Sequence, residues 1–151
     1  GWSVKNSGIM LHCQDPETML IDQEFPISAE VQLLGGLGTG ERTTANICSP
    51  GTDVYIKKEL AKYHCNNSNS KTYHEDDWVK VEVIVQSNNI IKHIVEGDTV
   101  LTYTNIKIGG NKVPFNYLND IGKPLDEGYI SLQSEGHPVE FRKIKIRNLD
   151  L

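Results

Sequence analysis

The chain has 151 residues, with 15 Lys and Arg against 20 Asp and Glu, which gives a formal net charge of -5. This length suits one domain with a sizeable core, so we expect residues 1–151 to form a single domain. The acidic balance argues against a nucleic-acid binder, which usually carries a basic patch. No segment approaches the roughly 18 consecutive apolar residues of a membrane span, so no membrane-spanning segment is expected.

Alternation of apolar and polar residues begins near the start of the chain and predicts strands at 7–14 and 28–35. Each strand would pack one face against a core and leave the other face available. The expected core-facing side chains are Ile9, Leu11, Cys13, Ala29, Val31 and Leu33. The expected side chains of the available face are Met10, His12, Gln14, Glu30 and Gln32.

The middle of the chain continues the two-residue period. Residues 78–103 hold three runs separated by the turn signals Ser-Asn-Asn and Glu-Gly-Asp, which predicts a three-stranded meander. Residues 54–64 are expected to hold one short helical turn. The long stretch 108–128 is either a binding loop or a crossover between two sheets. Many antiparallel strands joined by Gly- and Asn-rich turns predict an all-β sandwich.

Residues 128–146 predict two successive strands. In the first half, Ile130 and Leu132 alternate with polar residues, and after Gly136 the alternation resumes with Val139 and Phe141 pointing inward. If the two strands share a face, that face carries Gln133, Glu135, His137, Glu140 and Arg142.

The three cysteines suggest one bridge and one free thiol. Our first interpretation is a disulfide between Cys48 and Cys65, with Cys13 buried and reduced, as suits an exported protein. The alternative is a metal site that uses His12-Cys13 and His64-Cys65. Adjacent strand residues point to opposite faces, so each pair would easily supply only one ligand.

The outward polar side chains suggest a sugar-binding face. Sugars need alternating donors and acceptors in fixed positions, which Gln, Glu, His and Arg provide, and Trp78 or a tyrosine can add a stacking platform. The alternative is a solvated sheet face. Retaining and inverting glycosidases need two flanking carboxyls. The string Glu-x-Asp-x-x-Glu is absent here, although Glu30 can meet Glu135 or Glu140 across strands.

Several motifs together carry a family resemblance. The runs NSGIMLHCQ, DQEFPISAEVQLLGG, CSPGT, HCNNSNSKTY, DDWVKVEVIVQ, HIVEGDTVLTY and GYISLQSEGHPVEFRKIKI follow one another over nearly the whole chain. In this the chain resembles the 3-keto-disaccharide hydrolase domain family, many of whose members are called glycosyl hydrolases. The resemblance implies a concanavalin A-like jelly-roll β-sandwich and export from a bacterium, with the signal segment absent from this sequence.

The resemblance also implies a site and a chemistry. A ketone at C3 of a sugar acidifies the C2 proton, so a base can remove it, the C1 bond then breaks by elimination, and water adds back. Candidate bases are Glu30, His12 and His137. Arg142, or a divalent metal ion held by His and Glu, would stabilise the enolate oxygen. The expected substrate-binding residues are Asn6, Gln32, Gln133, Glu135 and Arg142.

One departure from the family concerns the start of the domain. Family members begin further upstream, so the resemblance implies that N-terminal strands are missing from this sequence. One edge of the sandwich would then be open, and a neighbouring chain can close it, which would make a homo-oligomer. Two further functions remain open: a non-catalytic carbohydrate-binding module with the same cleft, and a structural adhesion domain without a polar pocket.

Overall fold

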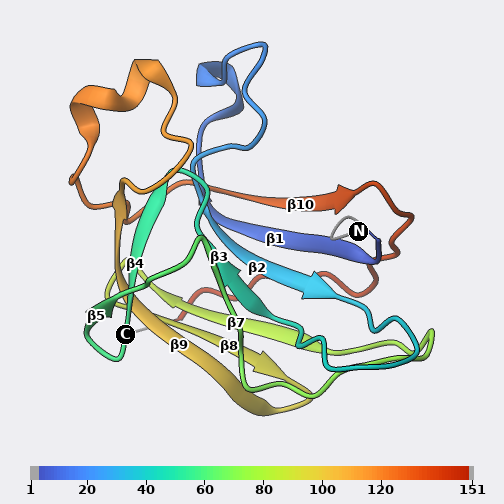
Figure 1. The fold of residues 1–151 in the computed structure, drawn as a ribbon. Coiled ribbons are helices and arrows are strands. Elements are labelled where there is room, and N and C mark those ends of the chain that lie inside the picture. Colours follow the sequence, from blue (N-terminus) through green and yellow to red (C-terminus); the bar gives the residue numbers. More distant parts are fainter. Residues whose placement is uncertain (1–3, 150–151) are drawn as a thin grey trace.

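We describe the protein from a computed structural model, in which residues 4–149 can be described. The chain forms two five-stranded antiparallel sheets that face each other as a β-sandwich (Figure 1). Within the described residues, no helix is long and apolar enough to cross a membrane. The predicted all-β sandwich is therefore confirmed, while its jelly-roll topology stays a prediction.

The first sheet carries most of the residues that are predicted to form the site. Its two predicted strands, near the start of the chain and around Glu30, both form. In spatial order the strands are β10 (Tyr129–Glu135), β1 (Asn6–Cys13), β2 (Ala29–Leu34), β3 (Asn46–Cys48) and β6 (Cys65–Asn66).

The second sheet contains the predicted meander. Three consecutive strands pair as neighbours in the order of the sequence, which confirms that prediction. In spatial order the strands are β5 (Glu59–Leu60), β4 (Thr52–Ile56), β9 (Asp98–Ile108), β8 (Ile90–Val95) and β7 (Val81–Gln86).

The core lies between the two sheets and follows the two-residue period. Leu11, Ala29 and Val31 of the first sheet are buried in one apolar cluster with Val54, Ile91 and Ile106 of the second.

One polar pair of side chains, His93 and Tyr103, is buried in this core. The ring of His93 donates from Nδ1 to the carbonyl of Ala45 at 2.8 Å, and its Nε2 accepts from the Tyr103 hydroxyl at 3.2 Å. The histidine is thus a satisfied core residue.

Two loops rise at one end of the sandwich, as the blue and orange segments of Figure 1 show. The first loop (residues 14–28) holds the 3₁₀ helix η1 (Pro16–Thr18), and the second loop (109–128) holds η2 (Phe115–Asp120). They contact each other, because the Tyr117 hydroxyl lies 2.9 Å from Thr18 Oγ1 and Asn116 donates to the Thr18 carbonyl at 3.1 Å.

Two predictions of secondary structure are wrong. Residues 54–64 contain no helical turn; instead β4 and β5 form a hairpin through Lys57 and Lys58, both of which have positive φ. The second strand expected within 128–146 is also absent, since 136–149 contain no strand. Apart from the partly buried Phe141, the apolar side chains of that segment and of the inner face of β10 are exposed, and no described strand pairs with residues 136–149. The exposed side chains are Ile130, Leu132, Val139, Ile144 and Ile146.

Candidate functional site

The candidate site is the face of the first sheet that points away from the core. Antiparallel register places directly paired residues on the same face. Gly8 of β1 is paired with Gln32 of β2 on one side and with Gln133 of β10 on the other. Two further rows flank this one along the same face. They are Leu34–Asn6–Glu135 on one side and Glu30–Met10–Ser131 on the other.

This register brings five of the sequence-predicted site residues onto one surface. The side chains on β1 and β2 are more deeply buried than those on the edge strand β10. Asn6, Glu30 and Gln32 are buried, whereas Gln133 and Glu135 are only partly buried. The β10 side of this face is therefore its more accessible side. The residues that share this surface are Asn6, Glu30, Gln32, Gln133 and Glu135.

Glu30 is the group with the strongest chemical signature. Its side chain is only 5% exposed, and burial raises its pKa from 4.5 to about 7, with the negative charge of Glu135 adding to the rise. Removing a carboxylate from water disfavours its charged form, and a nearby like charge does the same. A carboxyl that titrates near neutral pH can accept and release protons under ordinary conditions.

Gly8 makes the room for this carboxyl. A Cβ at Gly8 would lie 2.7 Å from Glu30 Oε1 and 3.2 Å from Gln133 Oε1, so the two oxygens converge over the glycine from opposite strands. Any side chain at this position would displace the carboxyl. The glycine of the sequence motif Asn-Ser-Gly is therefore needed because a side chain at this position would clash with Glu30.

Two buried acceptors on this face have no partner. Asn6 Oδ1 and Gln133 Oε1 make no hydrogen bond within the described structure. The amide nitrogen of Asn6 is occupied, because it donates to Glu135 Oε2 at 2.5 Å. Leaving a buried acceptor unsatisfied costs about 1–3 kcal/mol, so these atoms are suited to a ligand that brings O–H or N–H donors.

Asn46 of β3 is a member of the face that sequence reasoning missed. It is paired with Gln32 and donates from Nδ2 to Gln32 Oε1 at 3.3 Å. Its own Oδ1 accepts from the Ser68 amide at 2.9 Å and from the Thr43 hydroxyl at 2.7 Å. These bonds hold Asn46 rigidly and direct the amide carbonyl of Gln32 toward it. A strand of three residues has too short a pattern to show this from sequence.

The disulfide lies against the same face. Cys48 is paired with Glu30 across β2 and β3, and Cys48 and Cys65 are bonded to each other, as predicted. Cys13 is free and buried, also as predicted. The bridge therefore closes the β3 side of the site beside the carboxyl.

His12 does not join this surface, because a bulge interrupts β1. The pairing with β10 shifts between Met10 and Cys13, and His12 has a φ of 48°. Its Nε2 donates to the Ser87 carbonyl at 3.1 Å, in the turn between β7 and β8 of the other sheet. The bulge also places Cys13, predicted to face the core, beside Ser131, whose hydroxyl lies 3.5 Å from its sulfur.

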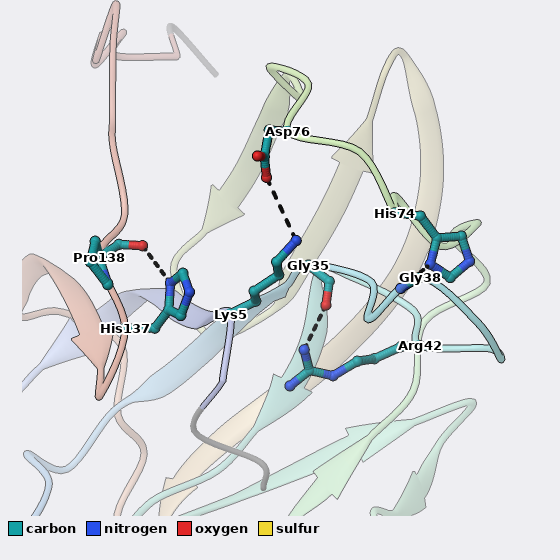
Figure 2. A network of polar contacts seen from close by, with 8 residues as sticks. All are labelled: Lys5, Gly35, Gly38, Arg42, His74, Asp76, His137 and Pro138. Carbon is teal, nitrogen blue, oxygen red and sulfur yellow. Dashed lines mark hydrogen bonds and ion pairs between the residues drawn. The ribbon is translucent and has the colours of Figure 1, made fainter.

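His137 and Arg142 follow β10 and contact other partners. Figure 2 shows the His137 ring turned toward its own chain, where Nδ1 donates to the Pro138 carbonyl at 2.7 Å. The guanidinium of Arg142 lies 4.0 Å from the ring centre of Trp78, a cation–π contact next to β7. One face of the Trp78 ring is thereby covered by Arg142. The expected face shared by two neighbouring strands does not form, since only the first of them is a strand.

Figure 2 also shows contacts near the start of β1. Lys5 Nζ lies 3.6 Å from Asp76 Oδ1, which joins the first sheet to the segment before β7. Among residues 4–149, no group of three or more His, Cys, Asp and Glu side chains is placed to hold a metal ion.

Comparisons with known proteins identify one family. No curated protein matches the chain. No solved structure matches it either. The 3-keto-alpha-glucoside-1,2-lyase-like domain matches residues 2–147, nearly the full length. The chain therefore belongs to the family of 3-keto-alpha-glucoside-1,2-lyase-like domains, whose name points to a role in carbohydrate chemistry.

Proposed function

We propose that the protein cleaves 3-keto-α-glucosides by elimination on the outer face of the first sheet, with Glu30 as the base. The observation that carries the proposal is the buried Glu30 carboxyl with its pKa of about 7, seated over Gly8 among amide groups. A base works best when its pKa lies near the working pH.

The reaction begins at the carbon between the ketone and the glycosidic bond. The C3 ketone acidifies the proton on C2, Glu30 takes that proton, and the electron pair forms the enolate of C2, C3 and the C3 oxygen. The enolate electrons then make the C1–C2 double bond and expel the glycosidic oxygen, which takes a proton from water and leaves as an alcohol. Glu30 returns the C2 proton to the solvent, which restores the proton balance. Water adds across the double bond to complete a net hydrolysis.

The amides beside Glu30 suit the charge that develops. The side-chain N–H groups of Gln133 and Gln32 lie on the same face and can donate to the enolate oxygen as it gains charge. The unpartnered oxygens of Asn6 and Gln133 can accept from sugar hydroxyls. One face thus supplies a base, donors and acceptors.

The test compares two substrates and two variants. A 3-keto-α-disaccharide and its unoxidised parent are incubated with the wild type, Glu30→Gln and the control Glu140→Gln, whose carboxyl follows β10 and is exposed. We expect cleavage of the keto sugar alone, and a loss of about 10²–10⁴-fold in Glu30→Gln only. Full turnover by Glu30→Gln would refute the proposal. A parallel arm with EDTA tests for a divalent metal.

The unpartnered acceptors also favour a second candidate, a carbohydrate-binding module without turnover. Asn6 and Gln133 could hold sugar hydroxyls without any proton transfer by Glu30. This candidate predicts measurable binding of the unoxidised disaccharide and no product from either sugar.

A further inference from the structure

A cavity lies between the two loops, beside the adjoining ends of β1 and β10. Its volume is about 220 Å³. This is below the roughly 300 Å³ of typical pockets for drug-sized ligands, so it suits a single ring. Its apolar lining comes from Ile27, Ile108 and Leu125, and its polar rim includes Asp15, Glu127 and the two tyrosines 117 and 129.

The cavity continues the row that holds the proposed active site. Tyr129, Ser131 and Gln133 alternate along β10 and therefore point to the same face. Cys13 lines the cavity and also contacts Ser131, which lies between Tyr129 and Gln133. The five residues from Tyr129 to Gln133 span about 13 Å of strand, more than one pyranose ring.

The rim groups of this cavity are available to a ligand. The side chains of Glu127 and Tyr129 are exposed, and within residues 4–149 neither side chain makes a hydrogen bond or an ion pair. Asp15 and Tyr117 are held in place, because Asp15 Oδ1 accepts from the Glu17 amide at 2.9 Å and the Tyr117 hydroxyl lies 2.9 Å from Thr18 Oγ1. Part of the rim is thus fixed, and part is free to bind.

Gly128 allows the chain between Glu127 and Tyr129 to approach the backbone of β1 closely. Its φ is 147°, and a Cβ there would lie 2.6 Å from the carbonyl carbon of His12. Only glycine tolerates this approach and this backbone conformation. Glu127 and Tyr129, on either side of it, are thereby placed at the rim of the cavity.

The charges select the ligand. The lining has two carboxylates, Asp15 and Glu127, and no Lys or Arg, so an anion would be repelled. Apolar side chains and tyrosines suit the carbon face of a sugar ring, and a carboxylate accepts strongly from hydroxyls. We infer that this cavity binds a neutral, hydroxylated sugar ring of a glycan that extends along β10. On the proposed function, on which this last step rests, the ring belongs to the leaving group.

The test measures binding of unoxidised sugars, which needs no turnover. Maltotriose and methyl α-glucoside are titrated calorimetrically into the wild type, Tyr129→Ala, Glu127→Gln and the control Ile130→Ala, whose side chain is exposed on the opposite face of β10. Hydrogen bonds to charged groups are stronger than those between neutral groups and add more to affinity. We therefore expect maltotriose to bind about tenfold or more tighter than methyl α-glucoside. Tyr129→Ala and Glu127→Gln should each lose about that factor, and Ile130→Ala should lose none.

Equal affinity of the two sugars, or unchanged maltotriose binding in both rim variants, would overturn the inference. The two proposals fail separately. If no keto sugar is cleaved but maltotriose binding depends on Tyr129 and Glu127, the lyase proposal fails and the sugar site stands. If cleavage depends on Glu30 but the rim variants bind maltotriose like the wild type, only the sugar site is refuted.

Discussion

The free energy of unfolding is expected to fall as pH rises through neutrality, because of Glu30. Its pKa is about 7 in the folded protein and 4.5 in an ordinary exposed carboxyl. The folded state therefore holds the Glu30 proton more tightly than the unfolded state does. The proton-bound carboxyl favours folding at low pH, and this stability is lost as pH rises from about 4.5 through about 7.

The size of the effect follows from the difference between the two pKa values. Each tenfold difference in proton affinity is worth about 1.4 kcal/mol, so the full penalty is about 3 kcal/mol above pH 7. Part of this free-energy penalty is already present at about pH 5, because the Glu30 carboxyl of the unfolded chain is mostly ionised at that pH. Between about pH 5 and about pH 8 the loss should be about 2 to 3 kcal/mol.

Urea unfolding of wild type and Glu30→Gln across this range isolates the effect, because the other titrating groups cancel in the difference. Glu30→Gln keeps the size of the side chain and removes its titration. We expect the wild type to lose stability relative to Glu30→Gln as pH rises, whereas the exposed-site control Glu140→Gln should follow the wild type. A wild-type minus Glu30→Gln difference that stays flat over this range would refute the assignment of a raised pKa to Glu30.

Three further predictions concern other parts of the fold. Gly8→Ala places a methyl group 2.7 Å from Glu30 Oε1 and should reduce turnover at least tenfold while the sandwich persists by circular dichroism; unchanged turnover would contradict the packing. The buried ring of His93 has its pKa lowered to about 4, so stability should fall as pH drops from about 6.5 toward 4, and an NMR titration midpoint near 6.5 would disprove this. Replacing Cys48 and Cys65 by alanine should cost about 3 kcal/mol in urea unfolding, an expectation undone if reduction of the wild type leaves its midpoint unchanged.

The sheet faces were predictable because antiparallel pairing preserves the two-residue period. The periodic runs around Glu30 and Gln133 contain no bulge, so the side chains that alternate in the sequence also share a face in the sheet. The disulfide was predictable because only two of the three cysteines flank a loop-like region. These features depend on local pattern alone.

The features that the sequence did not predict depend on tertiary contacts, which leave no pattern in the local sequence. One extra residue in the bulge of β1 turns His12 away from the face and brings Cys13 onto it, and the sequence around His12 still alternates as a regular strand would. The segment that holds Arg142 alternates equally well but forms no strand, because a strand also needs a neighbour to pair with. Asn46 was missed for a related reason, since tertiary contacts rather than periodicity define its short strand.

The central claim is that Glu30 removes the proton from C2 of a 3-keto-α-glucoside. The most direct measurement is kcat/KM for the substrate with hydrogen or deuterium at C2, from about pH 5 to about pH 9, for the wild type and Glu30→Gln. We predict a primary isotope effect and an activity that rises with pH through a midpoint near the Glu30 pKa of about 7, with both features lost in Glu30→Gln. Cleavage without an isotope effect, or with an unchanged pH profile in Glu30→Gln, would contradict the account.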